Sequence, residues 1–272
     1  MIETRRNRNM FEAASSFVEL VYNSVVRDIR KSSGSASLGL VNEILMSVLM
    51  FAMFWALFTF TGMKSLAIRG DFFIFLLTGI FLYLTHNKAI GSVMGASNAT
   101  SAIMKHAPMT TMVSILSSAF SALYLQVLAF IFILFMLHAL RGGLEFYNAA
   151  GLFLPFFLSW ASGCAIGLLF MTVKPLAPKF IALVAMMYKR ANMITSGKMM
   201  PANMMSAGMV KYFSWNPLFH TIDQSRGHAF VNYLPRNSNI EYAIYFTIIA
   251  LMIGLMGERW ISSRMSQSWS AR

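Results

Sequence analysis

The chain has 272 residues, of which 57% are hydrophobic and only 12% are charged. Soluble globular domains carry about 25% charged residues, so this composition, with a mean hydropathy of +0.60, excludes a soluble enzyme domain and indicates a single membrane domain. A net charge of +12 would suggest nucleic-acid binding in a soluble protein, but here the cations flank apolar segments and indicate membrane orientation. The single cysteine, Cys164, excludes a disulfide framework.

Residues 1–37 are predicted to form a basic cytoplasmic arm. Between Phe11 and Ile29, apolar side chains recur every three or four residues, opposite polar ones such as Glu12 and Glu19, which predicts an amphipathic helix. Basic residues surround this stretch, so the helix is expected to lie on the anionic cytoplasmic face of a membrane. A helix packed on another subunit is the alternative.

Six apolar segments follow and form one domain over residues 38–257. About 20 apolar residues, at about 1.5 Å each, cross a hydrocarbon layer about 30 Å thick. The second segment carries His86, Asn87 and Lys88 in its later half, which is therefore expected to face a cavity or to lie near an interface. The six predicted spans cover 38–60, 72–95, a stretch within 110–140, 149–173, 180–195 and 240–257.

Six spans place both ends of the chain on one side of the membrane. Lys and Arg are concentrated in the N-terminal arm, so the positive-inside rule makes both ends cytoplasmic, with residues 258–272 as a cytoplasmic tail. Residues 198–239 are then extracytoplasmic, and their aromatic and proline residues favour short broken helices that re-enter the interface. The predicted fold class is an all-α integral membrane protein with six transmembrane helices, an N-terminal amphipathic interfacial helix and short re-entrant extracytoplasmic helices before the last span.

The sequence lacks motifs for chemistry. It has no GxxxxGK[ST] phosphate loop, no HExxH and no CxxC, and its aspartates are far apart. We therefore expect no catalytic residue and no metal in this chain, and any ATP must be handled by another polypeptide. The group His220, Asp223 and His228 is more typical of a hydrogen-bonded turn than of a metal site. A membrane-embedded enzyme would need an acid, base or metal cluster, and a passive channel is a further alternative.

Several stretches, taken in order, share the pattern of one family. The most specific is WNPLFH, from Trp215 to His220, followed by Arg226, and a second is FLLTG, from Phe75 to Gly79. Further matches are Arg27 to Arg30 before Leu38 and Gly39, and Asn98 with Pro108, and a weaker one is Cys164 to Phe170. Over nearly its whole length the chain thus resembles the membrane permease subunits of type-2 ABC exporters, and within them the capsular polysaccharide export permeases.

The resemblance implies a homodimer in the cell inner membrane, with two copies of a separate ABC ATPase subunit that hold the ATP and Mg. No cofactor is expected on this chain itself. The exported substrate would be a lipid-linked capsular polysaccharide, passed on by periplasmic and outer-membrane export proteins. The same architecture exporting O-antigen, teichoic acid or a small amphiphile is the alternative.

The resemblance also implies two contacts with the ATPase. The loop over residues 96–108 would supply a coupling element, unless it is merely a solvated loop between helices; its candidate contact residues are Asn98, Lys105, His106 and Pro108. The amphipathic helix would act as a gate helix that guides the lipid-linked end of the substrate, with membrane anchoring alone as the alternative. Its candidate residues are Phe11, Val18, Arg27 and Arg30.

Lys189 and Arg190 interrupt the fifth predicted span, and a cation at the centre of a span costs about 2.5–3.5 kcal/mol on insertion scales. We hypothesise that they face the translocation path and attract phosphate or acidic sugars. The alternative is a broken span in which both residues snorkel or pair internally. Aromatic rings that could pack on sugar faces, or form ordinary interfacial belts, and one arginine complete the candidate path: Trp55, Tyr83, Tyr124, Trp160, Tyr188, Trp215 and Arg226.

Small residues occur in two pairs with a spacing of four, which would allow helices to approach closely within or between subunits. These pairs are Gly91 with Gly95 and Gly163 with Gly167.

Overall fold

The computed structural model describes residues 10–31, 36–62, 70–103 and 110–270, and within these ranges the secondary structure is helical, without strands. The α-helices are α1 (Met10–Lys31), α2 (Ala36–Phe60), α3 (Phe72–Leu76), α4 (Leu82–Ile103), α5 (Thr111–Arg141), α6 (Phe153–Val173), α7 (Pro178–Thr195), α8 (Ala207–Phe213), α9 (Pro217–Ala229) and α10 (Ile240–Ser270). Three shorter elements are the π-helix η2 (Leu77–Phe81) and the 3-10 helices η3 (Ala150–Leu152) and η4 (Ala202–Met204).

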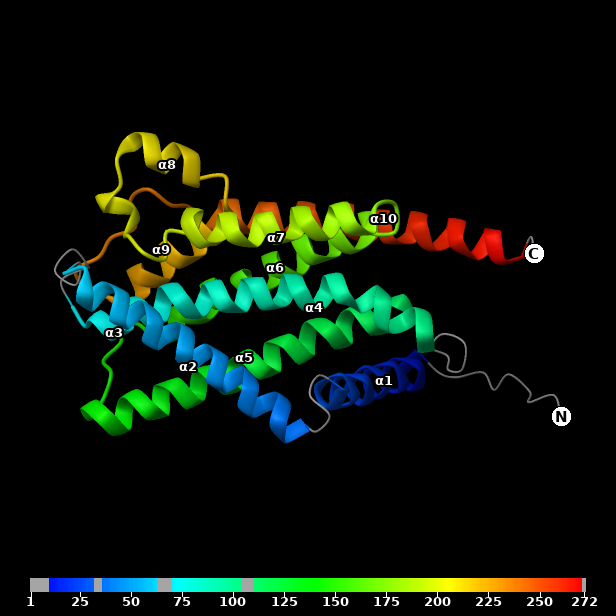
Figure 1. The fold of residues 1–272 in the computed structure, drawn as a ribbon, viewed down its shortest axis with the longest axis horizontal. Coiled ribbons are helices and arrows are strands. Elements are labelled where there is room, and N and C mark those ends of the chain that lie inside the picture. The colour runs from blue at the N-terminus through cyan, green and yellow to red at the C-terminus, as the bar shows by residue number, and fades with distance from the viewer. Residues whose placement is uncertain (1–9, 32–35, 63–69, 104–109, 271–272) are drawn as a thin grey trace.

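The long helices run along the longest axis of the molecule. In Figure 1, α2, α4, α5, α6, α7 and α10 extend in this direction. Helix α1 and the C-terminal part of α10 lie at one end, whereas α3, α8 and α9 lie at the other. The elements expected to be cytoplasmic are therefore gathered at the end opposite those expected to be extracytoplasmic.

Among the residues that the structure describes, five helical segments are long and apolar enough to cross a membrane. They cover Leu38–Phe60, Phe72–Ala96, Thr111–Arg141, Ala150–Val173 and Ile240–Ile261. These match five of the predicted spans, so an all-α, multi-pass membrane protein is confirmed. The predicted fifth span coincides with α7, but that helix has only 18 residues and includes Lys179, Lys189 and Arg190, so the count of six is not confirmed.

Helices α4 and α6 form the centre of the bundle, and glycine makes their close approach possible. A Cβ at Gly163 would lie 2.5 Å from the carbonyl oxygen of His86, and one at Gly167 would lie 2.9 Å from that of Ile90. Glycine at both positions thus lets α6 pack directly on the backbone of α4 within one chain, as the spacing of small residues predicted. Gly95 differs, because nothing lies within 4 Å of its Cβ position.

The predicted amphipathic helix is present as α1. It packs against α5 and α2 of its own chain, and the Ser117 hydroxyl donates a hydrogen bond of 2.8 Å to the Asp28 carboxylate. Much of its apolar surface stays uncovered, with Val18 66% exposed and Phe17 and Tyr22 also exposed. An uncovered apolar face beside basic residues agrees with a helix that lies in a membrane interface.

Candidate functional site

The connection between α7 and α10, residues 196–239, folds over one end of the bundle and is called the cap below. Its central element is α9, which packs against α4, α6 and α10. Asn216 caps α9 by accepting a hydrogen bond of 3.0 Å from the Leu218 N–H, and Pro217 fills the first helical position. The Asn216 amide also donates to Asn192 (2.8 Å) and Thr195 (2.9 Å) at the end of α7. The Asn-Pro pair therefore both starts α9 and ties it to α7.

Arg226, on α9, is fully buried and holds the start of the cap in place. Its guanidinium donates hydrogen bonds to the carbonyl oxygens of Gly197 (2.8 Å), Lys198 (2.8 Å) and Met200 (3.3 Å). The same group lies 4.3 Å from the ring centroid of Phe75. Burial lowers the pKa of Arg226 to about 10, so the group stays charged at neutral pH. A rigid guanidinium fork suits several carbonyls at once, which an ammonium cannot imitate.

The two most specific motifs of the sequence meet at this point. Phe75 and Gly79, from the FLLTG segment, pack against the side chain of Arg226, which belongs to the segment that begins with WNPLFH. A Cβ at Gly79 would lie 2.9 Å from the Lys198 carbonyl oxygen and 3.1 Å from an Nη atom of Arg226. Gly79 lies in the π-helix η2, an irregularity often found at functional positions. The motifs are therefore two halves of one contact between the second span and the cap.

Lys198 is the second buried cation of the cap, only 2% exposed. Its Nζ lies 3.4 Å from the ring centroid of Tyr83 and 4.4 Å from that of Phe54. No hydrogen-bond acceptor among the described residues reaches this Nζ. Two aromatic faces thus hold the cation, while burial lowers the pKa of Lys198 to about 7.

Asp223 and His220 are used inside the cap. The Asp223 carboxylate accepts hydrogen bonds from the Ala202 N–H (3.3 Å), the Ser238 hydroxyl (2.7 Å) and the Tyr233 hydroxyl. Within the described ranges, no group of three or more His, Cys, Asp or Glu is placed to hold a metal.

His220 joins both ends of the same segment. Its Nδ1 accepts from the Asn239 N–H (3.0 Å), so its Nε2, 2.7 Å from the Ser214 carbonyl oxygen, must donate. Burial lowers the pKa of His220, which favours this neutral tautomer. These contacts give the histidine a structural role in the cap.

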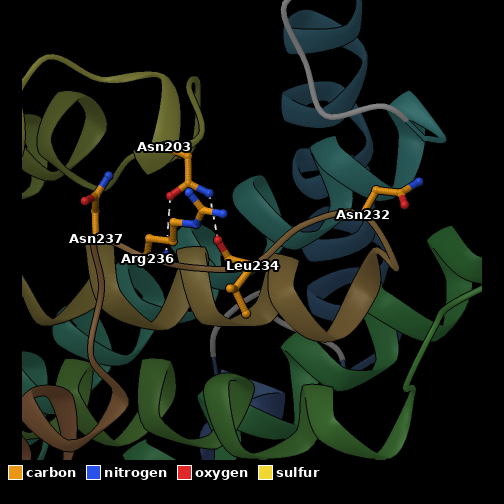
Figure 2. A pocket seen from close by; sticks show the side chains of 5 residues that line it. All are labelled: Asn203, Asn232, Leu234, Arg236 and Asn237. Atoms are coloured by element: carbon orange, nitrogen blue, oxygen red, sulfur yellow. Dashed lines mark hydrogen bonds between the residues drawn. The ribbon is translucent and has the colours of Figure 1, made fainter.

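A polar pocket of about 390 Å³ lies on the outer surface of the cap (Figure 2). Asn203 stands in its wall and pins the loop after α9, since its amide donates to the Leu234 carbonyl (2.7 Å) and accepts from the Arg236 N–H (3.3 Å). Asn232 and Asn237 complete the lining. Figure 2 shows the side chains of Asn203 and Arg236 directed toward each other. The Asn203 amide is used in hydrogen bonds that hold the loop after α9.

A second polar cluster lies inside the spans. Glu43 of α2 forms an ion pair with Lys88 of α4, and the Gln126 amide of α5 donates to the same carboxylate at 2.8 Å. The Glu43 side chain is 14% exposed and that of Lys88 is 37% exposed. One carboxylate therefore connects three spans, while its cationic partner stays accessible.

Lys189 and Arg190 point in different directions from α7. Lys189 is half-buried, and its Nζ lies 2.9 Å from the position that a Cβ would take at Gly91 of α4. Arg190 is exposed. No ion pair joins Lys189 to any described residue. The structure thus brings Lys189, but not Arg190, to the face of α4 that carries Lys88.

The predicted aromatic residues divide into inner and outer sets. Tyr83 is buried below Lys198, and Trp160 is half-buried with its indole N–H donating to the Ala119 carbonyl at 3.0 Å. Tyr188 is half-buried among rings, with centroids 6.4 Å from His86 and 6.3 Å from Trp215. The outer set, each more than one third exposed, consists of Trp55, Tyr124 and Trp215.

The predicted ATPase contacts are described only in part. Asn98 belongs to the last turns of α4, and Lys105, His106 and Pro108 lie outside the described residues. In the predicted gate helix, Phe11 is the second residue of α1, and Val18 and Arg30 are exposed. Arg27 is half-buried and forms an ion pair of 3.5 Å with Asp28.

Three features were not predicted from the sequence: the burial of Lys198, the contact of Gln126 with Glu43, and the pairing of Glu43 with Lys88. The sequence places Lys198 only at the start of the predicted extracytoplasmic segment. Opposite charges in two different apolar segments were an available signal for the pair. Nothing in the local pattern around Lys198 distinguishes it from an exposed lysine.

The fold and its two polar regions define a class: an all-helical, multi-pass membrane protein that carries charged side chains within its spans. Comparison with known proteins narrows this class. The chain is 26% identical over 252 residues to the polysialic acid transport protein KpsM of Escherichia coli, which covers 91% of this chain and 94% of that protein. A second Escherichia coli protein of that name is 24% identical over 248 residues, with the same coverage of both chains. The resemblance to capsular polysaccharide export permeases is therefore confirmed over nearly the whole chain, although no model of a known protein family matches it.

Proposed function

We propose that this chain is the transmembrane subunit of an ATP-driven exporter that moves lipid-linked capsular polysaccharide from the cytoplasm across the inner membrane. The observation that carries the proposal is the similarity over 91% of the chain to a protein named for polysialic acid transport. The cap supports it, because the motifs that carry the resemblance build one buried contact rather than scattered matches. The same architecture exporting O-antigen, teichoic acid or a small amphiphile is the alternative.

The proposal includes six crossings, with both ends cytoplasmic. Helix α1 and the C-terminal part of α10 lie at the same end of the bundle, and α7 runs lengthwise like the five apolar spans (Figure 1). An odd number of crossings would bring α1 and the end of α10 to opposite ends. The arrangement therefore supports α7 as a sixth crossing, polar because it faces a water-filled path. In this topology the cap is extracytoplasmic, and α8 and α9 re-enter the interface.

The path is proposed to run between two copies of the chain, each docked to one of two ATPase subunits. Trp55, Tyr124, Trp215 and Arg190 are exposed and remain its candidate contacts. Arg226 and Tyr83 are used inside the cap contact, so they would support the path rather than contact the substrate. The coupling loop, with Asn98, Lys105, His106 and Pro108, would transmit closure of the ATPase to the spans as a two-state element. Periplasmic and outer-membrane export proteins would then receive the polymer.

Deletion of the chain tests this function. Surface polysaccharide and glycan retained inside the cell are measured together, in the deletion strain and after restoring the intact gene. Loss at the surface with accumulation inside, reversed by the gene, is the expected result. Unchanged glycan in both places would reject the capsule function and favour a small amphiphile as the substrate.

A passive channel is distinguished by the ATPase. We expect an ABC ATPase subunit to co-purify with the chain from gently solubilised membranes, and transport to stop when ATP is withdrawn. Transport that continues without ATP would contradict the proposal.

A further inference from the structure

We propose that Lys88 and Lys189 form a binding site for one anionic group, carboxylate or phosphate, inside the spans, and that Glu43 is the internal anion which this group displaces. The inference deepens the proposed export function. It rests on that function only for the identity of the ligand, a polysaccharide or its lipid anchor, that carries the anionic group. Its geometry comes from residues of α2, α4, α5 and α7.

The two ammonium groups lie over the same stretch of α4. Lys88 and Gly91 are three residues apart on this helix, so they share one face with neighbouring Cβ positions. The Nζ of Lys189 occupies the space above Gly91, 2.9 Å from where a Cβ would be. Because Gly91 has no side chain, the cation from α7 reaches the backbone of α4 one turn away from Lys88.

The charges of this cluster are not balanced. Lys88 and Lys189 both lie against this face of α4, but the one carboxylate beside them, that of Glu43, pairs with Lys88 and accepts from Gln126, while no ion pair joins Lys189 to a described residue. The Lys88 side chain is 37% exposed and Lys189 is half-buried, so both can be reached from outside the chain. An accessible cation within a span requires either an anion or a water-filled cavity. An anionic group placed between the two lysines would meet this requirement for each of them.

Glu43 gives the site a means of release. When no ligand is present, its carboxylate keeps Lys88 paired, and Gln126 holds that carboxylate in place. An arriving anion competes with Glu43 for Lys88 and gains Lys189 as a second donor. When the anion leaves, the internal pair forms again. Such competition keeps the affinity for each anionic group of a polymer low enough for movement.

Binding of two charged probes tests the inference without requiring transport. The purified chain, with the ATPase subunit that co-purifies with it, is placed in lipid nanodiscs without ATP. It is titrated with a fluorescent lipid-linked oligosaccharide of glucuronic acid and with the matching oligosaccharide of glucose. Because the charged probe gains hydrogen bonds to two ammonium groups that the neutral probe lacks, we expect the native chain to bind it at least about tenfold more tightly.

The variants separate binding from structural support. The double variant Lys88→Gln with Lys189→Gln should bind both probes equally, whereas Lys211→Gln, on the exposed surface of α8, should behave as the native chain does. Glu43→Gln should increase the affinity for the charged probe by about tenfold, because the competing carboxylate is gone. A purely structural role for Glu43 would not produce this gain.

Glycine variants test the geometry with both lysines intact. Gly91→Ala should reduce the preference for the charged probe, because its methyl group displaces the Lys189 ammonium. Gly95→Ala, on the same helix but with open space at its Cβ, should leave the preference unchanged. Since the displaced atom is the far end of a flexible side chain, the fold itself should tolerate the methyl group at residue 91.

Equal affinity of the native chain for both probes, or an unchanged preference in the double lysine variant, would overturn the site. So would a lower affinity for the charged probe in Glu43→Gln. The deletion experiment and the binding experiment test different claims. A strain that keeps its surface glycan after deletion contradicts capsule export, but loss of charge discrimination in the double lysine variant would still support the anion site.

Discussion

A conservative substitution of Arg226 should destabilise the start of the cap, because this side chain binds three of its carbonyl oxygens. The variant Arg226→Lys keeps the charge, but lysine has a shorter side chain and a single nitrogen. Its ammonium group therefore cannot reach all three carbonyl oxygens that the guanidinium binds at 2.8, 2.8 and 3.3 Å. Loss of about two such bonds, at about 1.5–3 kcal/mol each and partly repaired by relaxation, amounts to about 3 kcal/mol. The contact with the Phe75 ring is lost as well.

Hydrogen exchange measures this loss where it occurs. Amides of the segment from Gly197 to Met205 are compared in native chain and variant, in nanodiscs at one pH. A local opening that is easier by about 3 kcal/mol lowers protection by about 100-fold. Arg236→Lys is the matched control, because Arg236 belongs to the same cap but is exposed. Equal protection in native chain and Arg226→Lys, or an equal loss in the control, would refute the role assigned to Arg226.

Three further predictions concern the cap, the bundle and the coupling loop. Burial lowers the pKa of Lys198 from 10.5 to about 7, so between these values the unfolded state binds more protons and stability rises with pH. The thermal midpoint should therefore rise from about pH 7 to about pH 10 in the native chain and in Lys211→Met, but rise less in Lys198→Met. An equal rise in Lys198→Met would contradict this reasoning. Gly163→Ala should destabilise the fold by about 1–3 kcal/mol, seen as a lower thermal midpoint, because its Cβ would lie 2.5 Å from a backbone oxygen; Gly95→Ala, with open space, should not, and equal midpoints would disprove tight packing of α4 on α6. With a reagent that joins a thiol to an amine, Lys105→Cys should become cross-linked to the co-purifying ATPase subunit, whereas Lys211→Cys should not. Absence of any cross-link from Lys105→Cys would remove Lys105 from the coupling contact.

Apolar length and period were enough to predict most of the fold. Five spans and the amphipathic helix follow from patterns that are local in sequence. The sequence predicts α7 as a span, but with Lys189 and Arg190 within its 18 residues this helix is less apolar than the five that meet the length and apolarity expected of a membrane span. Gly163 and Gly167 were predicted as sites of close approach, but only the structure shows that both face α4.

The site was predictable as a set of segments but not as contacts. The WNPLFH segment and FLLTG were found from sequence, yet nothing in either one shows that Arg226 stacks on Phe75. Burial of Lys198 depends on two rings from α2 and α4, which no local pattern around residue 198 reveals. Residues that depend on pairing between distant helices, such as Glu43 with Lys88, are those that sequence reasoning could list but not join.

ATP-driven export of polysaccharide is the central claim, and transport into inside-out membrane vesicles tests it most directly. Vesicles that contain the chain and its co-purifying ATPase subunit receive labelled lipid-linked polysaccharide on the outside, with or without ATP. The account predicts that label becomes protected inside the vesicles only when ATP is present, and not in vesicles that lack the chain. Protection without ATP, or protection that does not depend on the chain, would contradict it.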